Sequence, residues 1–194
     1  MLLLRDIVLF MIIAVGLGVG SAYFAVNHAD RLERIEIGPW HSWLDASGPD
    51  ANPYAKADQA RKGSLPLGSG EGLSFVAETD NDGTPLDGAC QYRIYGTQLP
   101  ARLWTLSLIT SDDKLVNNPS NRYGFHSQNI ARLKASDTER YEIVTAPEVM
   151  GGNWLKSEAA SSFRLILRLY DTSLKSSGGL GDIKLPNIAW DSCQ

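Results

Sequence analysis

Two short polar and aromatic segments carry the side chains best suited to bind a ligand. Arg122 and Tyr123 follow an Asn-Pro turn signal, whereas Asn153 and Trp154 follow two glycines. Both segments are predicted to be loops, where binding residues concentrate on β scaffolds. An arginine can clamp a carboxylate or a phosphate, an aromatic ring can stack on another ring, and an amide can orient a polar group. This chemistry is that of a binding site.

The same residues also have a purely structural interpretation. Asn153 can cap a turn, Trp154 can close the core, and Arg122 can pair with a nearby acid. The residue types and their spacing do not separate this interpretation from ligand binding, so both stay open.

A second set of polar side chains lies on a predicted strand. Arg164 and Arg168 alternate with apolar residues and therefore point to the same face as Tyr170. They can line a polar cavity, or they can form the solvated face of an antiparallel sheet. Arg168 is accordingly a further candidate binding residue.

Patterns typical of catalysis or metal binding are not found in the sequence. The histidines, His28, His41 and His126, show no metal-ligand spacing with one another. There is no Gly-x-Ser-x-Gly elbow, P-loop, dinucleotide fingerprint or calcium loop. His126 lies close to Arg122 and stays a candidate for binding, whereas no catalytic residue, metal or cofactor is assigned.

The elements that must position these residues are mostly strands. Short apolar runs alternate with small groups of glycine, proline, serine and asparagine, which is typical of a β-rich domain with many turns. Strands are predicted at residues 34–37, 73–78, 90–95, 102–110, 141–145 and 163–170.

Two short helices are expected among these strands. Asn52 can cap a helix whose first position is Pro53, and Gly63 can end it. A second short helix is predicted to begin near Ser127.

An uncharged apolar run, Ile7–Val26, precedes the β-rich part. At about 1.5 Å per residue, about 20 helical residues span the ~30 Å hydrocarbon core of a bilayer. A cleaved signal peptide is the alternative, with residues 20–22 as a cleavage site. The run is longer than a signal peptide requires, and Tyr23 and Phe24 continue it beyond that point. A retained membrane anchor is therefore favoured.

The charges that flank the apolar run do not settle its orientation. Arg5 precedes the run, whereas Arg31 and Arg34 follow it. The positive-inside rule is therefore ambiguous here, or slightly contrary to export of the domain.

The sequence also indicates which partners to expect. Gly16 and Gly20 have the small-xxx-small spacing that lets two membrane helices approach closely, which predicts a homodimer. A net charge of −4, without a cluster of lysines and arginines, argues against nucleic acid as a partner.

Two cysteines, Cys90 and Cys193, bear on the location of the domain. An even number of cysteines in an exported domain predicts a disulfide, which would tie down the end of the chain. The alternative is a pair of unrelated free thiols.

Several segments together resemble the family catalogued as domain of unknown function 1214. The resemblance covers about residues 85–190 and is carried by residues 100–106, 118–123, 152–155, 167–170 and 185–188. It implies a β-sandwich or jelly-roll-like domain, found behind an N-terminal membrane segment in Gram-negative bacteria or fused behind another domain. One departure is Lys156, where the family usually has proline.

Together these observations predict a mainly β protein with a single transmembrane helix. Residues 1–26 form the anchor, and residues 27–194 form a periplasmic domain at the inner membrane. The domain is expected to bind a ligand or a partner protein of the cell envelope. The alternative is an envelope hydrolase or carbohydrate-acting enzyme that uses Arg122, His126 and nearby acids.

Overall fold

The structure of the protein is a computed structural model. It describes residues 2–27, 34–43, 47–63, 65–68, 70–118, 120–135, 138–158, 162–172 and 183–193. His28, Arg31 and Pro119 therefore lie outside the described residues. The chain divides into two compact units, residues 1–34 with 45–66 and residues 35–44 with 67–194.

The first unit contains the apolar run as one continuous helix, α1 (Leu2–Asn27). Within it, residues 3–25 are long and apolar enough to cross a membrane, and none of that stretch is buried against the rest of the protein. The large side chains are exposed on every side of the helix. A helix that is apolar on all sides is stable where this surface is shielded from water, for example in a membrane. The homodimer through Gly16 and Gly20 stays a prediction.

The second helix, α2 (Pro53–Lys62), begins and ends where the sequence indicates. The Asn52 side chain accepts a hydrogen bond from the backbone N–H of Tyr54, with 2.8 Å between the two atoms. Pro53 occupies the first turn, where a backbone N–H is not needed. Gly63 ends the helix in the left-handed conformation, with φ of 62°, which glycine adopts without a steric penalty.

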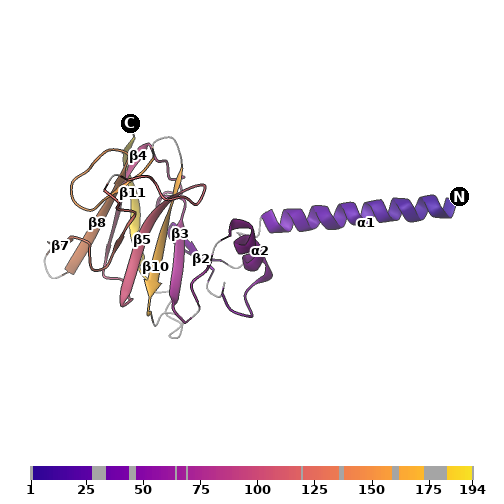
Figure 1. The fold of residues 1–194 in the computed structure, drawn as a ribbon, viewed down its shortest axis with the longest axis horizontal. Helices are drawn as coiled ribbons and strands as arrows, with labels where there is room; N and C mark the ends of the chain where they lie inside the picture. The colour runs from indigo at the N-terminus through magenta and orange to yellow at the C-terminus, as the bar shows by residue number, and fades with distance from the viewer. Residues whose placement is uncertain are drawn as a thin grey trace. The chain divides into compact units, whose positions relative to one another are not determined.

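The second unit is a sandwich of two β-sheets (Figure 1). We call the sheet with the order β1-β2-β3-β10-β5-β6 the first sheet, and the sheet with the order β11-β4-β8-β7 the second sheet; β9 pairs with β8. The strands are β1 (Ile35–Ile37), β2 (Trp40–Ser42), β3 (Gly72–Ala77), β4 (Cys90–Thr97), β5 (Leu103–Thr110), β6 (Gly124–His126), β7 (Arg132–Ala135), β8 (Thr138–Ala146), β9 (Trp154–Lys156), β10 (Phe163–Tyr170) and β11 (Asn187–Cys193).

Alternation of buried and exposed residues explains the sandwich. In β10, buried residues alternate with half-buried ones along the whole strand, and β5 shows the same pattern. Because successive side chains of a strand point to opposite faces, each sheet turns one apolar face inward. The largest fully buried side chains of this core are Trp40, Trp104, Tyr92, Phe75 and Phe125. The predicted mainly β, sandwich-like fold is confirmed.

The predicted disulfide between Cys90 and Cys193 is present in the structure. It joins the first residue of β4 to the last residue of β11, which are paired neighbours in the second sheet. It closes a stretch of 103 residues, so that the edge strand β11 is held covalently as well as by hydrogen bonds.

The helix predicted near Ser127 is wrong. Residues 127–129 form a turn, in which the Asn129 side chain accepts a hydrogen bond from the His126 N–H. The chain then enters β7, which pairs with β8. A short apolar periodicity cannot distinguish a helix from a strand when a neighbouring strand offers backbone hydrogen bonds.

Candidate functional site

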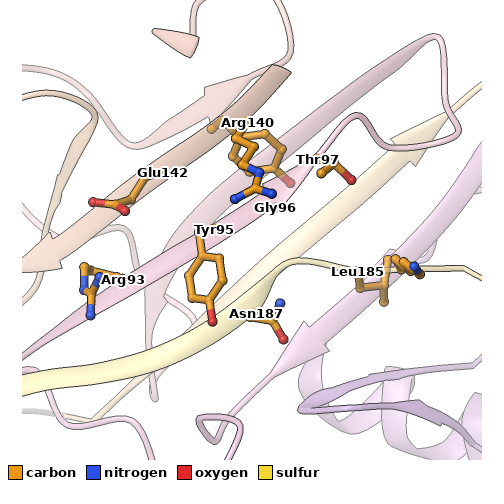
Figure 2. A pocket seen from close by; sticks show the side chains of 10 residues that line it. Arg93, Tyr95, Gly96, Thr97, Arg140, Glu142, Leu185 and Asn187 are labelled. Atoms are coloured by element: carbon orange, nitrogen blue, oxygen red, sulfur yellow. The ribbon is translucent and has the colours of Figure 1, made fainter. Parts of the chain in front are cut away.

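A groove of about 570 Å³ is the best candidate for a functional site (Figure 2). It lies on the outer face of the second sheet and reaches the segment that leads into β11. Its volume falls within the range of small-molecule sites, about 300–1,000 Å³.

The strand register explains why polar side chains meet in this groove. Tyr95 of β4 lies between Asn187 of β11 and Glu142 of β8, and Thr97 lies opposite Arg140. Cross-strand neighbours share a face of the sheet. Figure 2 shows Arg93 and Glu142 toward one end of the groove and Thr97 and Leu185 toward the other.

The cationic side chains of the groove are not equivalent. Arg93 Nε lies 3.4 Å from Asp191 Oδ1, and Asp191 also accepts a hydrogen bond from Gln91 Nε2 at 2.7 Å. Arg140 and Lys184 are exposed, and neither forms an ion pair with any residue that the structure describes. The unmatched positive charge therefore belongs to Arg140 and Lys184.

A hydrogen-bond pair at the base of β11 orients an amide of the groove. Asn81 Oδ1 accepts from the backbone N–H of Ile188 at 2.7 Å, and Asn81 Nδ2 donates to Asn187 Oδ1 at 2.8 Å. The Asn187 amide is thus fixed through its oxygen, and its Nδ2 donates to no described residue. An oriented amide donor of this kind suits a hydroxyl or carboxylate oxygen.

Tyr141 lies between Arg140 and Glu142 along β8, so its side chain points to the opposite face of the sheet from theirs, into the core. Its ring packs against Trp104 of the opposite sheet with 4.9 Å between the ring centroids, and the residue is 4 % exposed. The hydroxyl has no hydrogen-bond partner among the described residues. Burial raises the pKa of Tyr141 above its ordinary value, so the hydroxyl stays protonated and can donate at neutral pH.

Gly96 keeps space open beside this hydroxyl. A Cβ atom at Gly96 would lie 3.2 Å from the Tyr141 hydroxyl oxygen and 3.4 Å from Pro186 Cα. Both Gly96 and Tyr141 line the groove. Any larger residue at position 96 would therefore crowd the buried Tyr141 hydroxyl.

Asn153, a candidate binding residue from the sequence, holds backbone groups together in the structure. Its Oδ1 accepts from Ala131 N–H at 2.9 Å, and its Nδ2 donates to the carbonyl oxygens of Ala131 and Glu142, both at 2.8 Å. The residue is 9 % exposed. Its amide closes the gap between the start of β7 and the start of β9, beside β8.

Trp154 and Arg122 lie apart from the groove. Trp154 is half-buried opposite Val144, and its indole N–H donates to the Ala146 carbonyl at 3.1 Å. Arg122 is exposed before β6, with its guanidinium carbon 5.0 Å from the centroid of the Phe125 ring. Tyr123 beside it is 37 % exposed.

His126 and Arg168 share the outer face of the first sheet. The register aligns Ser74, Arg168, Thr105 and His126 in one row across β3, β10, β5 and β6. His126 Nδ1 accepts a hydrogen bond from the Gln128 N–H at 3.3 Å. The structure thus brings these two candidates onto one face, whereas Asn153 and Trp154 belong to the other sheet.

None of the candidate binding residues from the sequence lines the groove. Arg93 and Tyr95 alternate along the strand predicted at residues 90–95 and were open to the reasoning applied to Arg164 and Arg168, whereas Thr97 lies beyond that predicted strand. Lys184 and Asn187 carried no such signal, because only the pairing of β11 with β4 brings them to this face.

A second hollow, of about 630 Å³, lies around the residues that follow β5. Its polar groups are turned toward one another: Lys156 Nζ donates to the Asn117 carbonyl at 3.2 Å, and the Thr110 hydroxyl accepts from Lys114 N–H at 3.1 Å. Among the described residues, no group of three or more histidine, cysteine or acidic side chains is placed to hold a metal ion.

Comparison with solved structures finds the same fold in part of one longer protein. The VPA0106 protein of Vibrio parahaemolyticus matches with a TM-score of 0.57 and 22 % identity, over 74 % of this chain and 36 % of that chain. An uncharacterised protein from Burkholderia cenocepacia matches with a TM-score of 0.42 and 15 % identity, over 67 % of this chain and 32 % of that one. The chain thus spans about a third of the length of these two proteins.

No curated protein matches the chain. A family model does match, over residues 71–174 and therefore over more than half of the sequence, and its description is "Protein of unknown function (DUF1214)". These residues run from just before β3 to just after β10, and they include β4, β5 and β8. The chain belongs to the DUF1214 family.

Proposed function

We propose that the protein is a membrane-anchored ligand-binding domain of the bacterial cell envelope. Residues 1–26 anchor it in the inner membrane, and residues 27–194 lie in the periplasm and bind a small ligand in the groove of the second sheet. The observation that carries the binding role is the groove itself, which is lined by two exposed cations, Arg140 and Lys184, and by the exposed ring of Tyr95.

Two features support the location. The helix α1 is apolar along residues 3–25 and buries none of this surface in the protein, as expected of a segment that lies in a bilayer. The disulfide between Cys90 and Cys193 fits an oxidising compartment such as the periplasm, because cytosolic thiols are kept reduced.

A reporter fusion tests the location. Alkaline phosphatase fused after Gln194 is active only when its own disulfides form outside the cytoplasm. We expect activity from this fusion and none from a matched fusion that lacks residues 1–26. An inactive full-length fusion would remove the periplasmic location.

A blocking substitution tests the binding role. The full chain, in nanodiscs of phosphatidylcholine, is screened by thermal shift against free amino acids, dicarboxylates, saccharides and sugar phosphates. Thr97→Trp fills the groove from an exposed position, so it should abolish the shift that any bound compound gives.

Leu103→Trp is the matched control for this screen, because it adds the same ring to the outer face of the first sheet. A compound that shifts both variants as much as the unsubstituted chain would bind elsewhere. If no compound in the screen gives a thermal shift that Thr97→Trp abolishes, the proposed binding role is wrong.

A further inference from the structure

We propose that the groove binds an acidic saccharide, a sugar unit that carries a carboxylate or a phosphate group. This inference rests on the proposed binding function and names its ligand class. The acidic group lies between Arg140 and Lys184, and the sugar ring lies on Tyr95.

The charge distribution favours an anion at one end of the groove. Arg93 is compensated by Asp191, whereas Arg140 and Lys184 have no ion-pair partner among the described residues. Thr97 lies opposite Arg140, and Figure 2 shows Leu185, the chain neighbour of Lys184, toward the same end of the groove as Thr97. Arg140 and Lys184 both line the groove. A guanidinium and an ammonium together suit a carboxylate or a phosphate.

The other end of the groove suits hydroxyl groups. Glu142 lies opposite Tyr95, two residues from Arg140 along β8, which is about 7 Å along a strand. A carboxylate accepts hydrogen bonds from hydroxyls but repels a second acid. The ligand must therefore be acidic at one end and hydroxylated at the other, as an acidic sugar is.

The centre of the groove offers a flat aromatic surface. Tyr95 is 41 % exposed, although its neighbours Ile94 and Tyr92 along β4 are buried. A tyrosine ring provides an apolar face together with a polar tip. The apolar C–H face of a sugar ring can lie on that surface, while Asn187 Nδ2 and Thr97 are within reach of its hydroxyls.

The test is calorimetric titration of the full chain in phosphatidylcholine nanodiscs, which contain neither anionic lipid nor sugar-headed detergent. The probes are a galacturonic acid dimer, the neutral galactose dimer of the same linkage, and galactose 1-phosphate. We expect the acidic dimer or the phosphate, or both, to bind at least about tenfold more tightly than the neutral dimer. Which of the two binds identifies the source of the charge.

The variants separate the roles of the side chains. Arg140→Gln combined with Lys184→Gln should weaken the acidic probe about tenfold or more and remove the salt dependence of its affinity. Tyr95→Ala should weaken it about five- to tenfold, because the sugar ring loses the aromatic surface. The matched controls are Arg102→Gln, just before β5, and Tyr170→Ala on the first sheet, and both should leave the affinity unchanged.

Two outcomes overturn the inference. One is a neutral dimer that binds as tightly as the acidic probes; the other is an Arg140→Gln/Lys184→Gln variant with unchanged affinity for the acidic probe. If the broader screen finds a different compound in the groove and no saccharide binds, this inference fails while the proposed binding function stands. If nothing in that screen depends on Thr97, the binding function fails as well.

Discussion

The outer faces of the two sheets use their arginines differently. On the first sheet, Arg164 is only 15 % exposed and lies between Glu78 and Asp113, with 3.7 Å to Glu78 Oε1 and 2.5 Å to Asp113 Oδ1. Its guanidinium also donates to the Ser111 carbonyl. On the second sheet, Arg140 is exposed and has no ion pair with a described residue.

This difference separates a structural cation from one available for binding. The guanidinium of Arg164 has two carboxylates in place of part of its hydration water. The guanidinium of Arg140 has no such partner, so a ligand can still replace its hydration water. Arg164 lies between the apolar residues Phe163 and Leu165, whereas Arg140 lies between Glu139 and Tyr141. Neither pattern shows which arginine has acidic partners in the fold. The partners on adjacent strands make the difference.

The largest expected effect on stability concerns the disulfide of the second sheet. Cys193→Ser removes the disulfide that closes 103 residues, which on the chain-entropy model lowers the free energy of unfolding by about 4.7 kcal/mol. Urea unfolding, followed by the fluorescence of the buried tryptophans, measures this loss. Cys90→Ser/Cys193→Ser should match the single variant, and a loss below about 1 kcal/mol would show that β11 is held by its backbone pairing alone.

The second prediction concerns Asn153, whose amide makes three hydrogen bonds to the backbone of the second sheet. Asn153→Ala should lower the free energy of unfolding by about 3 kcal/mol, at about 1 kcal/mol for each lost hydrogen bond. The exposed Asn117 is the matched control, because only its backbone carbonyl makes a described bond. If Asn153→Ala leaves the free energy of unfolding unchanged but alters ligand affinity, Asn153 is a binding residue instead.

Substitution of each arginine tests whether Arg164 is structural and Arg140 is not. Arg164→Gln leaves Glu78 and Asp113 without their cation and should lower the free energy of unfolding by about 1–2 kcal/mol. Arg140→Gln should change it by less than about 0.5 kcal/mol. Equal losses in urea unfolding would mean that Arg140 is as structural as Arg164.

The smallest effect concerns the Tyr141 hydroxyl. At neutral pH, Tyr141→Phe should leave the free energy of unfolding unchanged or raise it by up to about 1 kcal/mol, because no described hydrogen bond is lost. Burial raises the pKa of Tyr141 above its ordinary value near 10. The folded state therefore binds more protons than the unfolded state above pH 10, and stability falls as the pH rises there.

Urea unfolding between pH 9 and 11.5 checks this dependence. The unsubstituted chain should lose up to about 1.4 kcal/mol per pH unit more than Tyr141→Phe above pH 10. Tyr92, whose pKa burial also raises, contributes equally to both chains and cancels from the difference. Parallel pH profiles would show that the Tyr141 hydroxyl is solvated in the folded protein.

Long, regular elements could be predicted from the sequence; among the described strands of three residues, only β1 was predicted, from the alternation of residues 34–37. The alternation in residues 163–170 matches β10 at both ends, and the capping residues around α2 place that helix correctly. β2, β6 and β9 have three residues each, too few for a period to be visible. The turn and strand that follow His126 were predicted as a helix for the same reason.

The sequence by itself determined the apolar helix, the β-rich sandwich with its family, and the pair of cysteines that form the disulfide. Local periodicity and composition suffice for these features, because they depend on which residues are apolar and how they are spaced. Only the tertiary structure decided which polar residues meet. The β4–β11 and β4–β8 registers bring Lys184, Asn187, Tyr95 and Arg140 into one groove. Hydrogen bonding between strands far apart in the chain sets those registers, and a single sequence does not record it.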